Sequence, residues 1–218
     1  MAKSRQQPRK MLDLDQFESL EDAMTKAEPG TRYRDVAGLL ASIPNGDITM
    51  LSLFWMSMIT RCQGLHSAIA REIRHENAAA VFPLVRAYAE AAVVLIYAID
   101  HPAYVETIAH HPSERPKHVP ARKSVQALIS YASSQAAGFK DVYAELSEAT
   151  HFGSTAMWAA IHPGDDRAIS WTSYPRWRPN QGEIACAQVL ELADVMEELL
   201  RKFAVRHLGV THESAYAD

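Results

Sequence analysis

The sequence predicts an all-α protein, a helical bundle around one hydrophobic core. Residues of high helix propensity, chiefly Ala, Leu, Met, Glu and Gln, dominate its long segments, and only 9 of the 218 residues are glycine. About half of the residues, 48%, are hydrophobic, which is enough to fill the core of a single domain of this length. Apolar residues also recur at helical spacing in three long segments, 47–74, 77–100 and 180–207.

The N-terminal part of the chain is expected to add only short helices to this bundle. Its first residues, 1–12, are polar and basic, and two stretches, 12–26 and 33–42, each fit a short amphipathic helix that ends before a Pro-Gly or Pro-Asn-Gly turn. We therefore expect a tail with short helices at 1–46, a helical bundle domain at 47–208 and a C-terminal tail at 209–218.

The long segments carry end signals that predict where their helices begin and stop. Asp47 is a good N-cap for the first helix. Pro83 lies early in the second segment and would either kink that helix or occupy its first position. Asn180 with Glu183 three residues later is a capping-box arrangement for the last helix, and Gly209 suits the position just after its end.

Two irregular stretches separate these helices, and each leaves two interpretations open. The first, 101–120, has a composition typical of a polar loop around a short helix, with a zinc site as the alternative, because it holds His101, His110, His111 and His118. The second, near 163–180, predicts a small aromatic loop or hairpin, since 169–172 alternates like a strand. It would be either an aromatic lid on the bundle or a flap that stacks bases and touches phosphates.

Charge and cysteine content favour a cytoplasmic protein. A formal net charge of −4 is not that of a protein whose whole surface binds nucleic acid. The basic N-terminal stretch lacks the apolar core of a secretory signal, and Cys62 and Cys186 have neither disulfide nor metal spacing. No Walker loop, Rossmann fingerprint, zinc-finger spacing or nucleophile elbow occurs, so we expect no cofactor and no metal.

The segment 77–100 is apolar on nearly every side, yet it carries Arg86 and Glu90 in its middle. It is long enough to span a membrane, but two charges would be costly there, and we expect burial in a soluble bundle instead. Residues four apart share one helix face, so the pair should look inward together, at a polar site. The alternative is a buried ion pair that only fixes helix register.

A second polar stripe follows in the segment after Gly138. Tyr143, Ser147 and His151 are spaced by four, so one helix face carries a phenol, a hydroxyl and an imidazole. If this helix packs against 82–97, these side chains reach the Arg86 and Glu90 pair. The two interpretations are a functional site and a polar seam satisfied by hydrogen bonds across the bundle.

These positions resemble a known group of proteins. Uncharacterised bacterial helical proteins in or near the HEPN superfamily show a similar arrangement, matched here by Arg86-x3-Glu90 and then Tyr143-x3-Ser147-x3-His151. The resemblance covers about residues 47–207 and implies an up-and-down four-helix core and a homodimer. Many members of the superfamily are metal-independent ribonucleases of toxin, antiphage or CRISPR-linked systems, and others only bind.

The usual catalytic signature of that superfamily is an arginine followed a few residues later by a histidine. The arginine contacts phosphate, and the histidine assists attack by the ribose 2′-hydroxyl. The signature is expected at the start of the last core helix. In this chain the same spacing of arginine and histidine occurs at other places, namely Arg61–His66, Arg201–His207 and Arg206–His212.

Two hypotheses of different class follow. The first is an RNA-cleaving enzyme in which His151 is general base or acid and Arg86 stabilises the phosphorane. Glu90 would orient either His151 or Arg86, and Ser147 and Tyr143 would position the substrate. The second is a catalytically silent helical module that dimerises or binds RNA, a nucleotide or another partner, and uses the same residues as structure.

Overall fold

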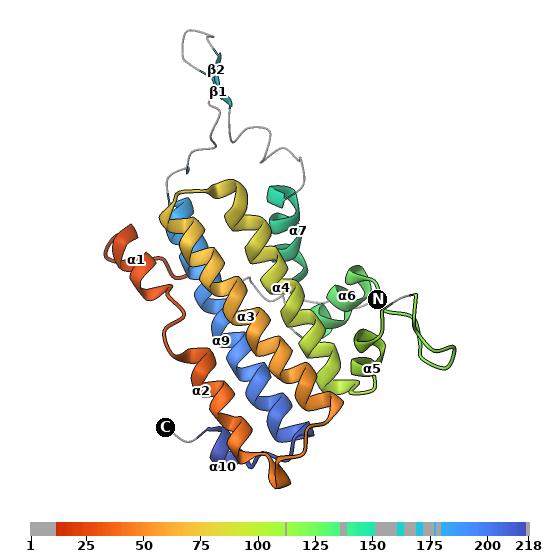
Figure 1. Cartoon of the computed structure of the whole chain (residues 1–218). Coiled ribbons are helices and arrows are strands. Elements are labelled where there is room, and N and C mark those ends of the chain that lie inside the picture. Colours follow the sequence, from red (N-terminus) through yellow and green to blue (C-terminus); the bar gives the residue numbers. More distant parts are fainter. Residues whose placement is uncertain are drawn as a thin grey trace, which may run out of the picture.

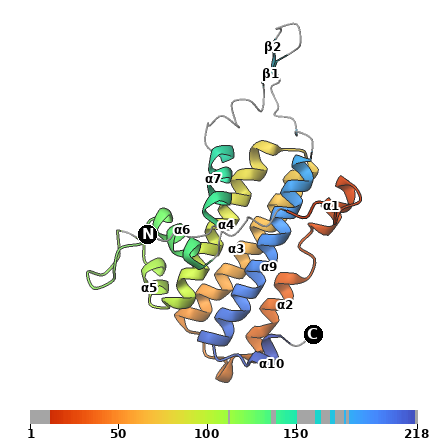
Figure 2. The same cartoon turned by 180° about the vertical axis from the view of Figure 1, so that it is seen from behind.

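The computed structural model describes residues 12–111, 113–135, 139–150, 161–163, 169–171, 177 and 180–216, and it confirms the all-α bundle. Three long helices, α3 (Met50–Arg74), α4 (Ala78–Asp100) and α9 (Gln181–His207), pack against one another. The fourth core helix, α7 (Phe139–Thr150), packs on α4, and its direction completes an up-and-down arrangement (Figure 1). α9 lies behind α3 in the view of Figure 1 and faces the viewer in Figure 2.

Two contacts fix the directions of the long helices. Near the start of α3, the Trp55 indole Nε1 donates a hydrogen bond of 2.9 Å to the carbonyl oxygen of Leu200, near the end of α9, so these helices are antiparallel. The last turns of α4 and α9 lie together, since Arg206 Nη1 donates to Asp100 Oδ1 at 2.8 Å. Because α4 and α9 end side by side, their apolar stripes can pack against each other along the length of both helices.

The helix ends differ in part from the sequence prediction. α3 begins later than Asp47, because Thr49 and Ser52 form a reciprocal capping box. The capping box expected at Asn180 is absent; this residue has a positive φ of 63°, and its side chain does not cap the helix. Gly209 is confirmed as the residue after the α9 cap, with a φ of 73° that glycine adopts without strain.

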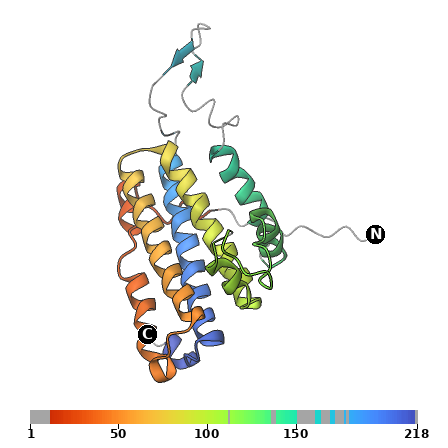
Figure 3. The same ribbon diagram turned by 45° about the vertical axis from the view of Figure 1, so that its right-hand side comes forward.

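Short elements cover the outside of the long helices. α1 (Leu20–Lys26) and α2 (Arg32–Gly38) pack on α3 and α9, and both are shorter than predicted because Ser19 caps α1 and 3₁₀ turns follow α2 (Figure 3). The remaining elements are η1 (Leu39–Ser42), η2 (Pro44–Gly46), α5 (Tyr104–Ala109), α6 (Val125–Gln135) and α10 (His212–Ala215). The predicted hairpin is present as antiparallel strands β1 (Ile161–Pro163) and β2 (Ile169–Trp171).

A buried polar chain ties the N-terminal helices to the core. His66 of α3 is fully buried, and its Nε2 lies 2.8 Å from the carbonyl oxygen of Ala27, which can only accept a hydrogen bond. Nε2 therefore carries the proton, and Nδ1 accepts from the Tyr33 hydroxyl at 3.2 Å. That hydroxyl in turn bonds to the hydroxyl of Tyr88 in α4. Four segments are thereby joined through groups that have no access to water.

α4 is the centre of the bundle. By length and composition it is apolar enough to cross a membrane, the one such helix in the part of the chain that the structure describes. It packs against α3, α9, α6 and α7, and its buried residues form a large part of the core.

Acid should destabilise the protein through His66. Burial lowers the pKa of this imidazole below its ordinary value of 6.5. The unfolded chain therefore takes up a proton at a higher pH than the folded chain, and stability is lost as the pH falls below 6.5, by up to about 1.4 kcal/mol per pH unit. Urea unfolding at several pH values should show this slope in the wild type and a shallower one in His66→Gln. Equal slopes would show that His66 does not carry the effect.

The two thiols should be inert in the folded protein. Burial raises the pKa of both Cys62 and Cys186 to about 12, so neither presents a reactive thiolate at neutral pH. An aromatic disulfide reagent should react with both thiols only after denaturant is added. Fast reaction in native buffer would mean that one of the helices opens locally.

Candidate functional site

The predicted pair in α4 and one residue of α7 form a single cluster. Arg86 Nε donates to Glu90 Oε1 at 3.1 Å and to the Tyr143 hydroxyl at 3.0 Å. The Tyr143 hydroxyl donates to the same carboxylate oxygen at 2.6 Å. The guanidinium also lies over the Tyr143 ring, 5.0 Å from its centroid, which adds a cation–π contact. The three side chains thus share one closed set of contacts.

The cluster is half-buried and so retains contact with solvent. The side chains of Arg86 and Glu90 are 19% and 31% exposed, and Tyr143 is buried. Burial, and secondly the hydrogen bond to Glu90, raise the pKa of the Tyr143 phenol. This phenol therefore keeps its proton at neutral pH and acts as a donor to the carboxylate.

Local sequence explains why these residues meet. Arg86 and Glu90 are one turn apart on α4, on the face towards α7. On α7, Tyr143 and Leu146 are both buried in the apolar stripe, so packing of that stripe on α4 turns the phenol towards the pair. The cluster combines a cation, an acceptor and a neutral donor at the surface of the core, and such a set suits an anionic or a hydroxyl-bearing ligand.

Of the other two predicted site residues, the structure describes only Ser147, and it does not bond to this cluster. Ser147 follows one turn after Tyr143, but its hydroxyl donates to the Tyr143 carbonyl oxygen at 2.8 Å, inside its own helix. His151 lies outside the described residues, directly after the last residue of α7. Arg86, Glu90 and Tyr143 are therefore the predicted site residues that are brought together.

The remaining sequence matches are used as structure. His66 is buried in the polar chain with Tyr33, whereas Arg61 is exposed on the same helix, so the two do not share a site. Arg201 pairs with Glu197, and the ring of His207 bonds to the carbonyl oxygen of Ile99. Within the described ranges, no three His, Cys, Asp or Glu side chains are grouped as metal ligands.

The role of Tyr33 and Tyr88 as partners of His66 was not predicted, because tyrosines in amphipathic helices give no signal of a hydrogen-bonded pair. Trp177 belongs to the aromatic stretch for which a lid on the bundle is one interpretation. Its ring packs edge-on against Phe82, one turn before Arg86, at a centroid distance of 6.2 Å. The Trp177 Nε1 is buried without a hydrogen-bond partner, so a donor is left unsatisfied beside this part of α4.

Comparison with known proteins adds no relative. No family model matches the sequence, and neither a curated protein nor a solved structure matches it.

Glu90 and Tyr143 should be energetically coupled. Removing the phenol oxygen with Tyr143→Phe, or the carboxylate with Glu90→Ala, should destabilise the fold, and the double variant should lose less than the sum of both, by about 1 kcal/mol. The exposed Tyr131–Asp100 hydrogen bond of 2.7 Å is the matched control, and its coupling should be smaller. Strict additivity at Glu90 and Tyr143, measured by urea unfolding, would mean that this contact adds nothing to stability.

Proposed function

We propose that this protein is a HEPN-like, metal-independent endoribonuclease of toxin or antiphage defence type. RNA is its proposed substrate, the cytoplasm its proposed setting, and no membrane takes part. The observation that carries the proposal is the joining of Arg86, Glu90 and Tyr143 in one half-buried cluster. These are three of the five positions on which the resemblance rests.

In the proposed reaction, the ribose 2′-hydroxyl attacks the adjacent phosphorus while the bond to the 5′-oxygen breaks. His151 takes the proton from the 2′-hydroxyl or gives one to the 5′-oxygen, and the products are a 2′,3′-cyclic phosphate and a 5′-hydroxyl. Arg86 stabilises the charge that develops on the phosphorane oxygens. Glu90 holds the guanidinium in place, and the protonated phenol of Tyr143 positions the substrate together with Ser147.

The electrostatics of the cluster support this role. The Nε of Arg86 donates to Glu90 and to Tyr143. A guanidinium that is held by its Nε is oriented before substrate arrives, which reduces the ordering needed at the moment of reaction. The 19% exposure of its side chain leaves it close to solvent, where a backbone phosphate would approach.

A second candidate function is a catalytically silent helical module that binds RNA, a nucleotide or a protein partner. The observation that favours it is the closed hydrogen bonding of the cluster. Glu90 Oε1 accepts from both Arg86 and Tyr143, so these groups satisfy one another without a ligand. In that case the cluster would chiefly hold α7 on α4.

Cleavage of end-labelled single-stranded RNA in the presence of EDTA distinguishes the two functions. We expect the wild type to produce fragments that end in a 2′,3′-cyclic phosphate. His151→Ala and Arg86→Lys should each reduce the rate by about a hundredfold, since a proton-transfer group or an oriented guanidinium is lost.

His111→Ala is the matched control, because His111 is an exposed loop histidine that bonds locally to Ser113. This variant should cleave like the wild type, and both it and His151→Ala should melt like the wild type. The enzyme proposal fails if the wild type does not cleave RNA, or if His151→Ala cleaves at the wild-type rate. Binding of RNA without cleavage, lost in Arg86→Lys, would instead establish the silent module.

A further inference from the structure

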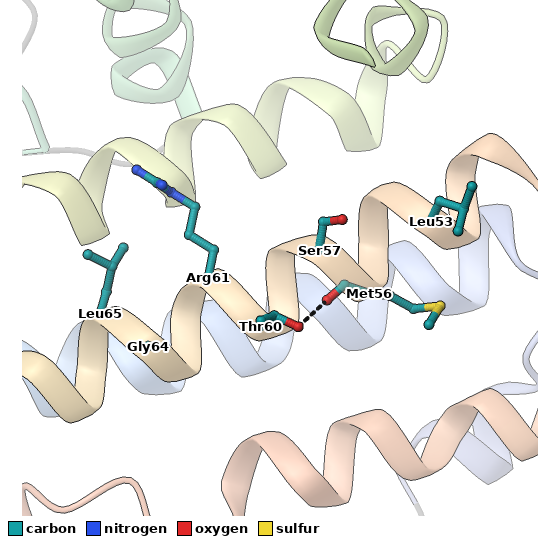
Figure 4. A pocket seen from close by; sticks show the side chains of 7 residues that line it. All are labelled: Leu53, Met56, Ser57, Thr60, Arg61, Gly64 and Leu65. Carbon is teal, nitrogen blue, oxygen red and sulfur yellow. Dashed lines mark hydrogen bonds between the residues drawn. The ribbon is translucent and has the colours of Figure 1, made fainter.

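The outward face of α3 exposes large apolar side chains in its first two turns and is nearly free of charge up to residue 70. Met50, Leu53 and Met56 are 52%, 45% and 37% exposed, and the last two line a shallow groove along α3 (Figure 4). Arg61 is the one charge between residues 48 and 70. Exposed large apolar side chains grouped on one helix face are a feature of protein interaction sites.

The exposed residues of this face follow a heptad spacing. Steps of three and four residues keep side chains on one stripe that packs along a second helix. Every residue at these steps along α3 is exposed, namely Met50, Leu53, Ser57, Thr60, Gly64, Ser67, Arg71 and Arg74. The opposite stripe, which includes Trp55, Cys62 and Ile69, fills the core of the bundle itself. α3 thus has a second packing face that the described elements leave uncovered.

Gly64 points independently to a close partner on this face. It lies inside α3, where glycine weakens a helix relative to alanine. A Cβ atom added at this position would meet nothing within 4 Å, so packing within one chain gives no reason for a glycine there. Close approach of another helix backbone is a physical reason for a glycine at an exposed helical position.

We propose that this face binds the same face of a second copy of the chain, with the two α3 helices antiparallel. Along the heptad stripe, Met50 and Leu53 are large and apolar, whereas Ser57, Thr60, Gly64 and Ser67 are small. An antiparallel pair centred between residues 58 and 59 sets a large side chain against a small one in its outer layers, and two small side chains against each other near its centre. The layers are Met50 with the partner's Ser67, Leu53 with the partner's Gly64, and Ser57 with the partner's Thr60.

The charges at the two ends of the face are complementary in this direction. Asp47 is exposed just ahead of α3, and Arg71 and Arg74 are exposed in its last turn. An antiparallel pair brings Asp47 of one copy to the end where the partner's Arg71 lies, whereas a parallel pair would bring the arginines of both copies together. Arg71 also contacts Glu72, but its side chain is 66% exposed and so retains donors for this contact.

This pairing goes beyond the proposed ribonuclease function and does not depend on it. The face lies on α3, whereas the cluster lies between α4 and α7. Loss of pairing and loss of cleavage are therefore measured separately, and either result stands without the other.

Sedimentation equilibrium over a range of concentrations tests the pairing. The wild type should have twice the 24.3 kDa mass of one chain. Leu53→Glu should weaken dimerisation at least tenfold, since it buries a carboxylate opposite the partner's Gly64. Val195→Glu is the matched control at 46% exposure on α9, and it should not change the mass. A monomeric wild type, or equal effects of both variants, would overturn the proposal.

Gly64→Leu provides a second variant that the single chain tolerates, because the space beside it is open. It should weaken the dimer, whereas Gly38→Leu, at the other open helical glycine, should leave the dimer unchanged. Unchanged dimerisation in Gly64→Leu would contradict close packing at this residue.

Cysteine cross-linking tests the direction. Leu53→Cys and Gly64→Cys in the same chain lie about 16 Å apart along α3, too far for an internal disulfide. Antiparallel pairing predicts a cross-linked dimer in the double variant and none in either single variant, because the native thiols are buried. Cross-linking of Leu53→Cys alone would establish a parallel pair and refute the proposed register.

Discussion

The structure depends on how α4 satisfies its polar groups while it remains the central apolar helix. Two residues along a helix turn the side chain by about 200°, so Tyr88 and the Arg86–Glu90 pair face opposite sides. On one side Tyr88 ends the buried chain through Tyr33 and His66. On the other side the ion pair receives the phenol of Tyr143. Each polar group on this helix thereby holds a neighbouring element in register.

The polar groups on the two sides of α4 differ in burial and in charge. The chain through Tyr33 and His66 is closed to water, contains only neutral groups and joins α2, α3 and α4, which suits a structural role. The cluster around Arg86 contains formal charges and reaches solvent, which suits a site for an anionic substrate. Burial is therefore what separates a fold-fixing network from a candidate active site in this protein.

Several elements followed from the sequence because their signals are local. The apolar periodicity of 47–74, 77–100 and 180–207 predicted the three long helices, and the spacing of Arg86 and Glu90 predicted their shared face. Errors arose where two local signals compete. Thr49 rather than Asp47 caps α3, because only the threonine lies at the right distance from Ser52 for a reciprocal bond. Asn180 precedes α9 in a left-handed conformation that its side chain does not use for capping.

The sequence by itself determined the fold class, the long helices and the pairing of Arg86 with Glu90, since each rests on residues within a few positions of one another. Only the tertiary structure decided that Tyr143 completes this pair, that Ser147 turns back to its own helix, and that His66 is buried with two tyrosines. Those outcomes depend on which helix faces meet. Helix faces are chosen by the packing of whole apolar stripes, and that choice is made by contacts between residues far apart in the chain.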